Sequence, residues 1–243
     1  MRTGAPCAPV PGAAQPGGII LPGTVPDAER VSAVVDALRR RYVQMEWWAA
    51  PPEEVMIGAV LVQQTRWENV ERAIGELRAA GLLSLPAIDR APAEEIERAV
   101  RCSGFFRVKT RRLKALARHV LAEYGSAEEM ARAETAALRR GLLLVPGVGE
   151  ETADAILCYA FSRCTFVVDA YTRRVASCAG IEASPRQLRA LFEAVLPREN
   201  ARYRETHAHI VEYGKKDCSR RRCDACLIRS LKGSDSDSHA RGS

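Results

Sequence analysis

The sequence has no long apolar run. None of its 243 residues belongs to a stretch of the roughly 20 apolar residues that a membrane-spanning helix needs. The first 25 residues are rich in proline and glycine and lack the sustained apolar core of a signal peptide. We therefore expect a cytoplasmic protein without a membrane partner, and we expect residues 1–25 and the low-complexity residues 233–243 to be disordered.

Strand patterns are also scarce. Only residues 164–168 are rich in β-favouring side chains, and such a short segment between helices favours an extended link over a sheet. Elsewhere apolar residues recur at three- and four-residue spacing, which predicts an all-α protein. Ser126 and Ser184 are expected to cap helices; the other predicted helices cover residues 31–42, 55–64, 70–77, 96–100 and 113–124.

Acidic residues are missing between positions 101 and 118. This strip carries seven basic residues, Arg101, Arg107, Lys109, Arg111, Arg112, Lys114 and Arg118, and the chain has a net charge of +6. Such a strip suits a phosphate backbone, although a solvated helix face has the same composition. We predict Lys109 as one of its DNA contacts.

The segment LLVPGVGEETADAILCYA, residues 143–160, joins a glycine-rich turn to an amphipathic helix. The helix start points toward Gly147 and Gly149, which have no side chains to keep a bulky group away from the backbone. Unpaired N–H groups at a helix start favour an anion. We predict that Gly147, Gly149 and Thr152 hold a DNA phosphate.

This segment and the following Asp169 together resemble the helix-hairpin-helix (HhH-GPD) DNA glycosylases related to endonuclease III. The resemblance spans about residues 27–226. It implies a central helical lobe, residues 51–163, with the hairpin motif at about 139–162. It also implies a discontinuous lobe, residues 26–50 plus 164–214, a Cys-rich basic loop, residues 215–232, and double-stranded DNA in the groove between the lobes.

A glycosylase must extrude its target base from the duplex, and the resemblance assigns residues to that task. Gln64 occupies the position at which this family fills the gap in the stack, and Phe105 the position of an apolar wedge. Trp47, Trp48 and Trp67 resemble the base pocket of the bacterial 3-methyladenine glycosylases on this scaffold. Aromatic faces suit a cationic alkylated purine, although the same residues could simply pack in a core.

The sequence also lacks a lysine that is central to part of this family. Members that cut the strand carry a lysine one residue before the hairpin threonine, and Glu151 stands there. A carboxylate cannot form the imine of that reaction, so we predict a monofunctional enzyme. Asp169 is the predicted catalytic residue, which would stabilise an oxocarbenium-like sugar and orient water; capping the next helix is its structural alternative.

A fourth cysteine is missing near the C-terminus. Cys218, Cys223 and Cys226 resemble the [4Fe–4S] loop of endonuclease III relatives, but Lys232 stands where the family has its fourth ligand. Such clusters are normally held by four thiolates. An unusual fourth ligand, a degenerate zinc or iron site and a lost cluster all stay open, and we predict metal binding.

These features predict a monomeric DNA glycosylase that acts on double-stranded DNA with a damaged base. An alkylated purine such as 3-methyladenine is the predicted target. One alternative is an endonuclease III-like glycosylase for oxidised or mismatched pyrimidines with little or no lyase activity. A second alternative is a non-catalytic DNA-binding module.

Overall fold

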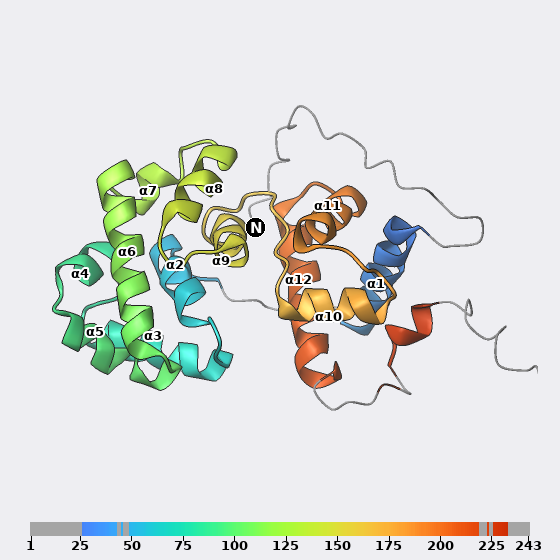
Figure 1. The fold of residues 1–243 in the computed structure, drawn as a ribbon, viewed down its shortest axis with the longest axis horizontal. Helices are drawn as coiled ribbons and strands as arrows, with labels where there is room; N and C mark the ends of the chain where they lie inside the picture. The colour runs from blue at the N-terminus through green and yellow to red at the C-terminus, as the bar shows by residue number, and fades with distance from the viewer. Residues whose placement is uncertain (1–25, 43–44, 46–48, 219–222, 224–225, 233–243) are drawn as a thin grey trace, which may run out of the picture. The chain divides into compact units, whose positions relative to one another are not determined.

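A computed structural model describes residues 26–42, 45, 49–218, 223 and 226–232 of the chain (Figure 1). Within these ranges the regular structure is helical and no strand occurs, which confirms the all-α prediction. Residues 164–168 form an extended link between two helices, as predicted. None of the helices in the described ranges is long and apolar enough to cross a membrane.

The chain forms two compact units. One contains residues 48–163, and the other combines residues 1–47 with residues 164–243. We name the first the hairpin unit, because it contains the glycine-rich turn, and the second the carboxylate unit, because it contains Asp169. Each unit is described by itself.

The hairpin unit is built around the apolar helix α2 and the long helix α6. Seven of the ten residues of α2 are buried, because this helix is apolar on all its faces. Helix α6 packs against α2, α4, α5 and α7 (Figure 1). The helices of this unit are α2 (Pro52–Leu61), α3 (Trp67–Ala79), α4 (Leu85–Arg90), α5 (Ala93–Ala99), η1 (Arg101–Ser103), α6 (Phe106–Tyr124), α7 (Ala127–Met130), α8 (Thr135–Leu144), α9 (Glu150–Ala155) and the π-helical turn η2 (Ile156–Ala160).

Two features of α2 and α7 bear on the predictions. Helix α2 ends at Leu61 and not at residue 64, because the chain turns there and Gln64 has a left-handed backbone with φ 55°. Helix α7 begins as predicted, with the Ser126 side chain accepting a hydrogen bond from the Glu129 amide at 3.1 Å.

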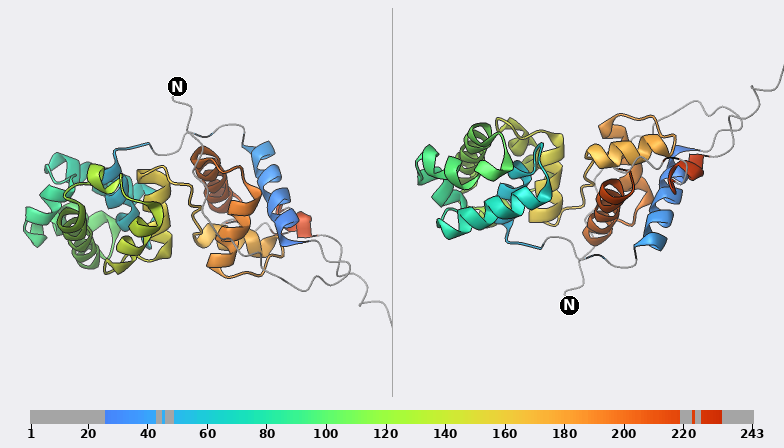
Figure 2. Two further views of the ribbon diagram at one scale, coloured as in Figure 1. Left: turned by 90° about the horizontal axis from the view of Figure 1, so that it is seen from above. Right: turned by 90° about the horizontal axis from the view of Figure 1, so that it is seen from below.

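The carboxylate unit joins segments from both ends of the sequence. Helix α1 (Asp27–Arg41) packs on α11 (Pro185–Val195) and α12 (Asn200–Lys216), and α10 (Ala170–Cys178) packs on α12 (Figure 2). The short η5 (Arg229–Lys232) contacts α1. Helix α11 begins with the predicted Ser184 cap, a reciprocal capping box with Gln187.

Candidate active site and nucleic-acid interface

The glycine-rich turn connects α8 to α9. Gly147 has φ +89°, which disfavours any residue with a side chain, and a Cβ atom there would collide with the Arg112 side chain of α6. Gly149 directly precedes α9 and is exposed, and no atom lies within 4 Å of the place where its Cβ would be. The turn therefore presents open backbone at Gly149, while Gly147 is packed against α6.

A glutamine that the sequence did not single out holds this turn. The amide nitrogen of Gln63 donates to the carbonyl oxygen of Gly147 and to the hydroxyl of Thr152, both at 3.0 Å. The Arg112 guanidinium donates to the amide oxygen of Gln63. Thr152 is 8% exposed. Its hydroxyl therefore supports the turn from inside, and the prediction that this side chain faces a phosphate does not fit the structure.

The predicted phosphate contact at Lys109 is wrong for this structure. Its side chain is 1% exposed, and Nζ donates to the carbonyl oxygens of Leu61 at 2.8 Å and Ser103 at 2.6 Å. Burial and, to a smaller extent, the charge of Arg112 lower the pKa of Lys109 to about 8, although Cys102 opposes the shift. Lys109 is thus an internal hydrogen-bond donor.

Much of the remaining basic strip is also engaged within the protein. Lys114 donates to the carbonyl oxygens of Ile88 and Asp89 at 3.1 and 3.0 Å. Arg118 pairs with the Asp89 carboxylate at 3.1 Å, and Arg107 with Glu97 at 3.8 Å. Sequence spacing could not separate these internal contacts from a phosphate-binding surface, because several cations of α6 reach groups on the neighbouring helices α4 and α5.

Gln64 and Phe105 lie in two exposed turns of the hairpin unit. Gln64 is exposed and follows α2, and Phe105 is 63% exposed and directly precedes α6. Both have left-handed backbones, with φ 55° and φ 47°. Such values are uncommon outside glycine, above all for a bulky residue, and often mark functional positions. The structure presents both side chains outward, as their predicted contact with DNA requires.

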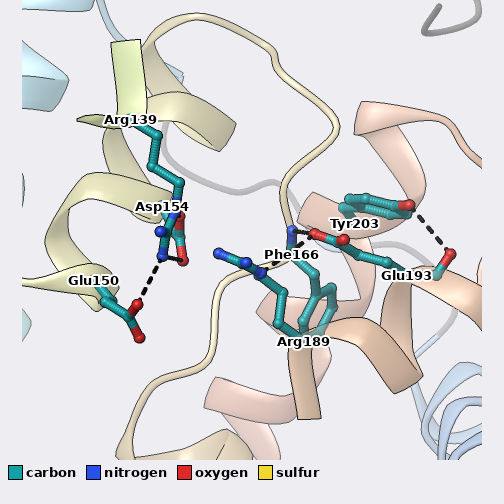
Figure 3. A network of polar contacts seen from close by, with 7 residues as sticks. All are labelled: Arg139, Glu150, Asp154, Phe166, Arg189, Glu193 and Tyr203. Carbon is teal, nitrogen blue, oxygen red and sulfur yellow. Dashed lines mark hydrogen bonds and ion pairs between the residues drawn. The ribbon is translucent and has the colours of Figure 1, made fainter. Parts of the chain in front are cut away.

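A buried ion pair joins the two helices of the hairpin motif. Arg139 of α8 contacts the Asp154 carboxylate of α9 through Nε at 2.7 Å and Nη2 at 3.2 Å, and Glu150 at 3.3 Å (Figure 3). Asp154 is 5% exposed, whereas the Glu150 side chain is 57% exposed. The ion pair with Asp154 therefore fixes α9 against α8 below the turn. Glu151 is exposed.

Asp169 caps helix α10 in the carboxylate unit. Its Oδ1 accepts hydrogen bonds from the amide of Thr172 at 2.7 Å and from the Thr172 hydroxyl at 2.9 Å. The other carboxylate oxygen faces Nε2 of His207 at 3.7 Å, and the Asp169 side chain is 16% exposed. The capping interpretation is confirmed, and it leaves one oxygen directed at an imidazole.

The pKa of Asp169 is lowered. Burial acts to raise it, but the electrostatic interaction with His207 at 3.7 Å and the hydrogen bonds from Thr172 together outweigh burial. The carboxylate is therefore kept ionised. An ionised carboxylate is the form that can stabilise a positive sugar or accept a proton from water.

Two close contacts set the position of Asp169. A Cβ atom on Gly214 would collide with the Tyr171 ring, so this glycine lets α10 approach α12 and brings Asp169 to His207. In the preceding link, the Phe166 amide donates to the Glu193 carboxylate at 2.9 Å (Figure 3). The Phe166 ring stacks on that of Phe192, with the centroids 4.4 Å apart. His207 and Gly214 belong to this arrangement, and sequence reasoning missed both.

The predicted base pocket is described only in part. Trp47 and Trp48 lie outside the described residues. Trp67 opens α3 and is partly buried against the core of the hairpin unit. Its pocket role stays a prediction, because packing against a core also explains its position.

The predicted metal ligands lie after α12. The Cys226 thiol contacts the Tyr213 hydroxyl at 3.3 Å and accepts from the Arg229 amide at 3.4 Å. Burial raises the pKa of Cys218 to about 11, and the nearby thiols of Cys178 and Cys226 add to the shift. In the part of the chain that the structure describes, no three histidine, cysteine or acidic side chains are grouped to hold a metal ion. Metal binding by Cys218, Cys223 and Cys226 stays a prediction.

Comparison with known proteins decides the family. Residues 57–198 match the family model of the HhH-GPD superfamily base excision DNA repair proteins. The chain belongs to the HhH-GPD superfamily. Within this superfamily it is 40% identical over 210 residues to a Methanocaldococcus jannaschii protein whose assignment as a DNA repair glycosylase is itself provisional, covering 84% of this chain and 96% of the relative. It is 26% identical over 183 residues to endonuclease III of Thermotoga maritima, covering 74% and 81%.

Two solved structures have the same fold as this HhH-GPD protein. The 3-methyladenine DNA glycosylase of H. pylori, bound to 1,N6-ethenoadenine, superposes with a TM-score of 0.64 at 28% identity, covering 79% of this chain and 98% of that one. Endonuclease III in a non-covalent DNA complex superposes with a TM-score of 0.71 at 21% identity, covering 84% and 94%. At its coarsest level, the activity is that of a DNA glycosylase of base excision repair.

Proposed function

We propose that this protein is a monofunctional DNA glycosylase that removes an alkylated purine, such as 3-methyladenine, by hydrolysis. The proposal rests on two features taken together. Asp169 is partly exposed and ionised, and a glutamate stands at position 151. The first can assist hydrolysis, and the second cannot form the imine that strand cleavage requires.

The chemistry assigned to Asp169 needs only its charge and its fixed orientation. As the bond between base and sugar breaks, positive charge develops on the sugar. A preorganised carboxylate stabilises that charge and can orient the attacking water or accept its proton. A cationic base is a good leaving group and needs little protonation, so a single carboxylate suffices.

The lysines support hydrolysis over imine formation. The chain has only five: Lys109, Lys114, Lys215, Lys216 and Lys232. Lys109 is buried between two carbonyl oxygens, Lys114 donates to two others, and Lys216 pairs with Glu212. These engaged amines are poor candidates for a nucleophile, because a covalent mechanism needs a free amine directed at the sugar.

The proposed substrate and partner rest on the comparison with solved structures and on the two exposed turns of the hairpin unit. The H. pylori relative is named for 3-methyladenine and was solved with a modified adenine. We propose double-stranded DNA with such a base as the partner. Gln64 and Phe105 would enter the duplex, the open backbone at Gly149 would lie against a phosphate, and Trp67 would flank the base.

The test uses duplexes that each carry one candidate lesion, followed by alkali to cut abasic sites. We expect release of 3-methyladenine and no release of thymine glycol or uracil. Asp169→Asn should slow release about a thousandfold, while duplex binding persists and α10 stays capped, because asparagine also caps helices well.

Other outcomes select the alternatives. Release of thymine glycol or uracil alone would indicate the endonuclease III-like glycosylase. Lesion binding without release of any base would indicate the non-catalytic module. Covalent trapping of the wild-type protein on lesion DNA by borohydride would refute the monofunctional assignment, since trapping requires an imine.

An iron–sulfur cluster on Cys218, Cys223 and Cys226 is a separate proposal, which rests on the spacing of these cysteines in the sequence. Iron analysis and visible absorbance of anaerobically purified protein test it. Stoichiometric iron that is lost in Cys226→Ser would support the cluster, and iron-free, fully folded protein would contradict it.

A further inference from the structure

Two exposed turns of the hairpin unit share an unusual backbone. Gln64 and Phe105 both have positive φ, and the Phe105 side chain is 63% exposed. A left-handed backbone is unfavourable for an L-residue with a side chain, so the surrounding structure must hold it. The question is which group holds these two turns.

The ammonium of Lys109 contacts the base of both turns. It donates to the carbonyl oxygen of Leu61, the last residue of α2, at 2.8 Å, and to that of Ser103, the last residue of η1, at 2.6 Å. Gln64 follows the first carbonyl by three residues, and Phe105 follows the second by two. Carbonyl groups at the end of a helix have no hydrogen-bond donor within that helix. The buried Lys109 ammonium supplies the donor for the last carbonyl of both α2 and η1.

The turn that carries Gln64 is also held from the hairpin. Gln63 donates to Gly147 and Thr152 and accepts from Arg112, which lies three residues after Lys109 on α6. Of the two neighbouring glutamines, one is thus committed inside the protein, and Gln64 is left to point outward. Lys109 and Arg112 of α6 together fix this turn relative to Phe105 and to Gly147.

We propose that Lys109 is a positioning residue that makes Gln64 and Phe105 a single two-pronged insertion element. With both turns fixed to one ammonium, the side chains reach DNA at a preset spacing, and entry of one is coupled to entry of the other. Preorganisation of this kind lowers the entropic cost of distorting the duplex. This inference rests on the proposed function, because it assigns the two side chains to extrusion of the base.

Lys114 provides a matched control. It lies on the same helix and also donates to two backbone carbonyl oxygens, but those belong to Ile88 and Asp89 and not to the two turns. Lys109→Met and Lys114→Met each remove two donors while keeping a side chain of similar length. Both substitutions should lower the stability of the protein. Only Lys109→Met should affect the insertion of Gln64 and Phe105 into DNA.

The experiment measures insertion without base release. The probe is a duplex with a tetrahydrofuran abasic analogue and 2-aminopurine in the opposite strand, so it does not depend on the preferred lesion. We expect wild-type protein and Lys114→Met to bind this duplex more tightly than undamaged DNA and to raise its fluorescence. For Lys109→Met we expect the preference to fall about tenfold, because the two turns are no longer preorganised for insertion, with affinity for undamaged DNA unchanged.

A double-mutant cycle tests the coupling even if Lys109→Met fails to fold. In the wild-type background, Gln64→Ala and Phe105→Ala should be non-additive in their effects on that preference. Strict additivity, or an unchanged preference in folded Lys109→Met, would overturn the inference and leave the proposed function intact. No preference for the damaged duplex by the wild-type protein would overturn both.

Discussion

Nε2 of His207 lies 3.7 Å from Oδ2 of Asp169, and the two residues come from different elements of the carboxylate unit. The other carboxylate oxygen is occupied by Thr172, so the imidazole faces the oxygen that is left. His207 is thus the group in this unit that can tune the charge of the proposed catalytic carboxylate.

Replacing His207 should move the acidic side of the pH–rate profile for base release to higher pH. His207 lowers the pKa of Asp169 against the opposing effect of burial, so His207→Gln raises that pKa and protonates the carboxylate at a higher pH. Single-turnover rates across the acidic range, from below the ordinary aspartate pKa of 3.8 up to neutral pH, measure this. His209→Gln, at another buried histidine of α12, is the control and should leave the acidic side of the profile in place.

The same shift predicts the pH dependence of stability. A depressed pKa contributes stability that is present above the unfolded pKa of Asp169 and is lost as the pH falls through the folded value. His207→Gln should therefore lose part of this contribution at a higher pH than the wild-type protein. Urea unfolding at several acidic pH values measures it, and parallel curves for the two proteins would argue against the assigned interaction.

Gly147→Ala should destabilise the hairpin, whereas Gly149→Ala should not. An alanine at 147 needs an unfavourable positive φ and collides with Arg112, so we expect a loss of about 2 kcal/mol in the free energy of unfolding. The space around the Cβ position of Gly149 is open, and its φ of −90° is ordinary. Weaker DNA binding by stable Gly149→Ala would indicate that a phosphate approaches this backbone.

Arg139→Met should be far more damaging than Glu150→Gln. Removing the guanidinium deprives the buried Asp154 carboxylate of its closest cation, which should cost about 3 kcal/mol. The contact with Glu150 is exposed and longer, so its loss should cost under about 1 kcal/mol. Chemical denaturation compares them, and equal losses would show that the ion pair with Asp154 does not fix α9.

Lys109 should make stability rise with pH in the alkaline range. Its folded pKa of about 8 lies below the ordinary 10.5, so the unfolded chain binds more protons between these values, and stability increases with pH there. Cysteines and tyrosines titrate in the same range, so the measured quantity is the difference between wild type and Lys109→Met. A difference that stays constant from about pH 8 to pH 10 would contradict the lowered pKa.

The sequence by itself determined the helical class, most helix positions, the family and the cap at Asp169. These features are local: apolar spacing, capping residues and a short motif are written in consecutive positions. The same local reading assigned Lys109 and Thr152 to DNA, because a cation or a hydroxyl near a glycine-rich turn looks the same whether it faces solvent or the interior.

Only the tertiary structure decided where those polar groups point. Lys109 meets the ends of α2 and η1, Gln63 rather than Gln64 holds the hairpin, and His207 reaches Asp169 across 38 positions of sequence. Such contacts depend on how helices pack, and packing is set by the fit of many side chains at once and not by any one motif. For this reason these positioning residues could not be predicted from sequence.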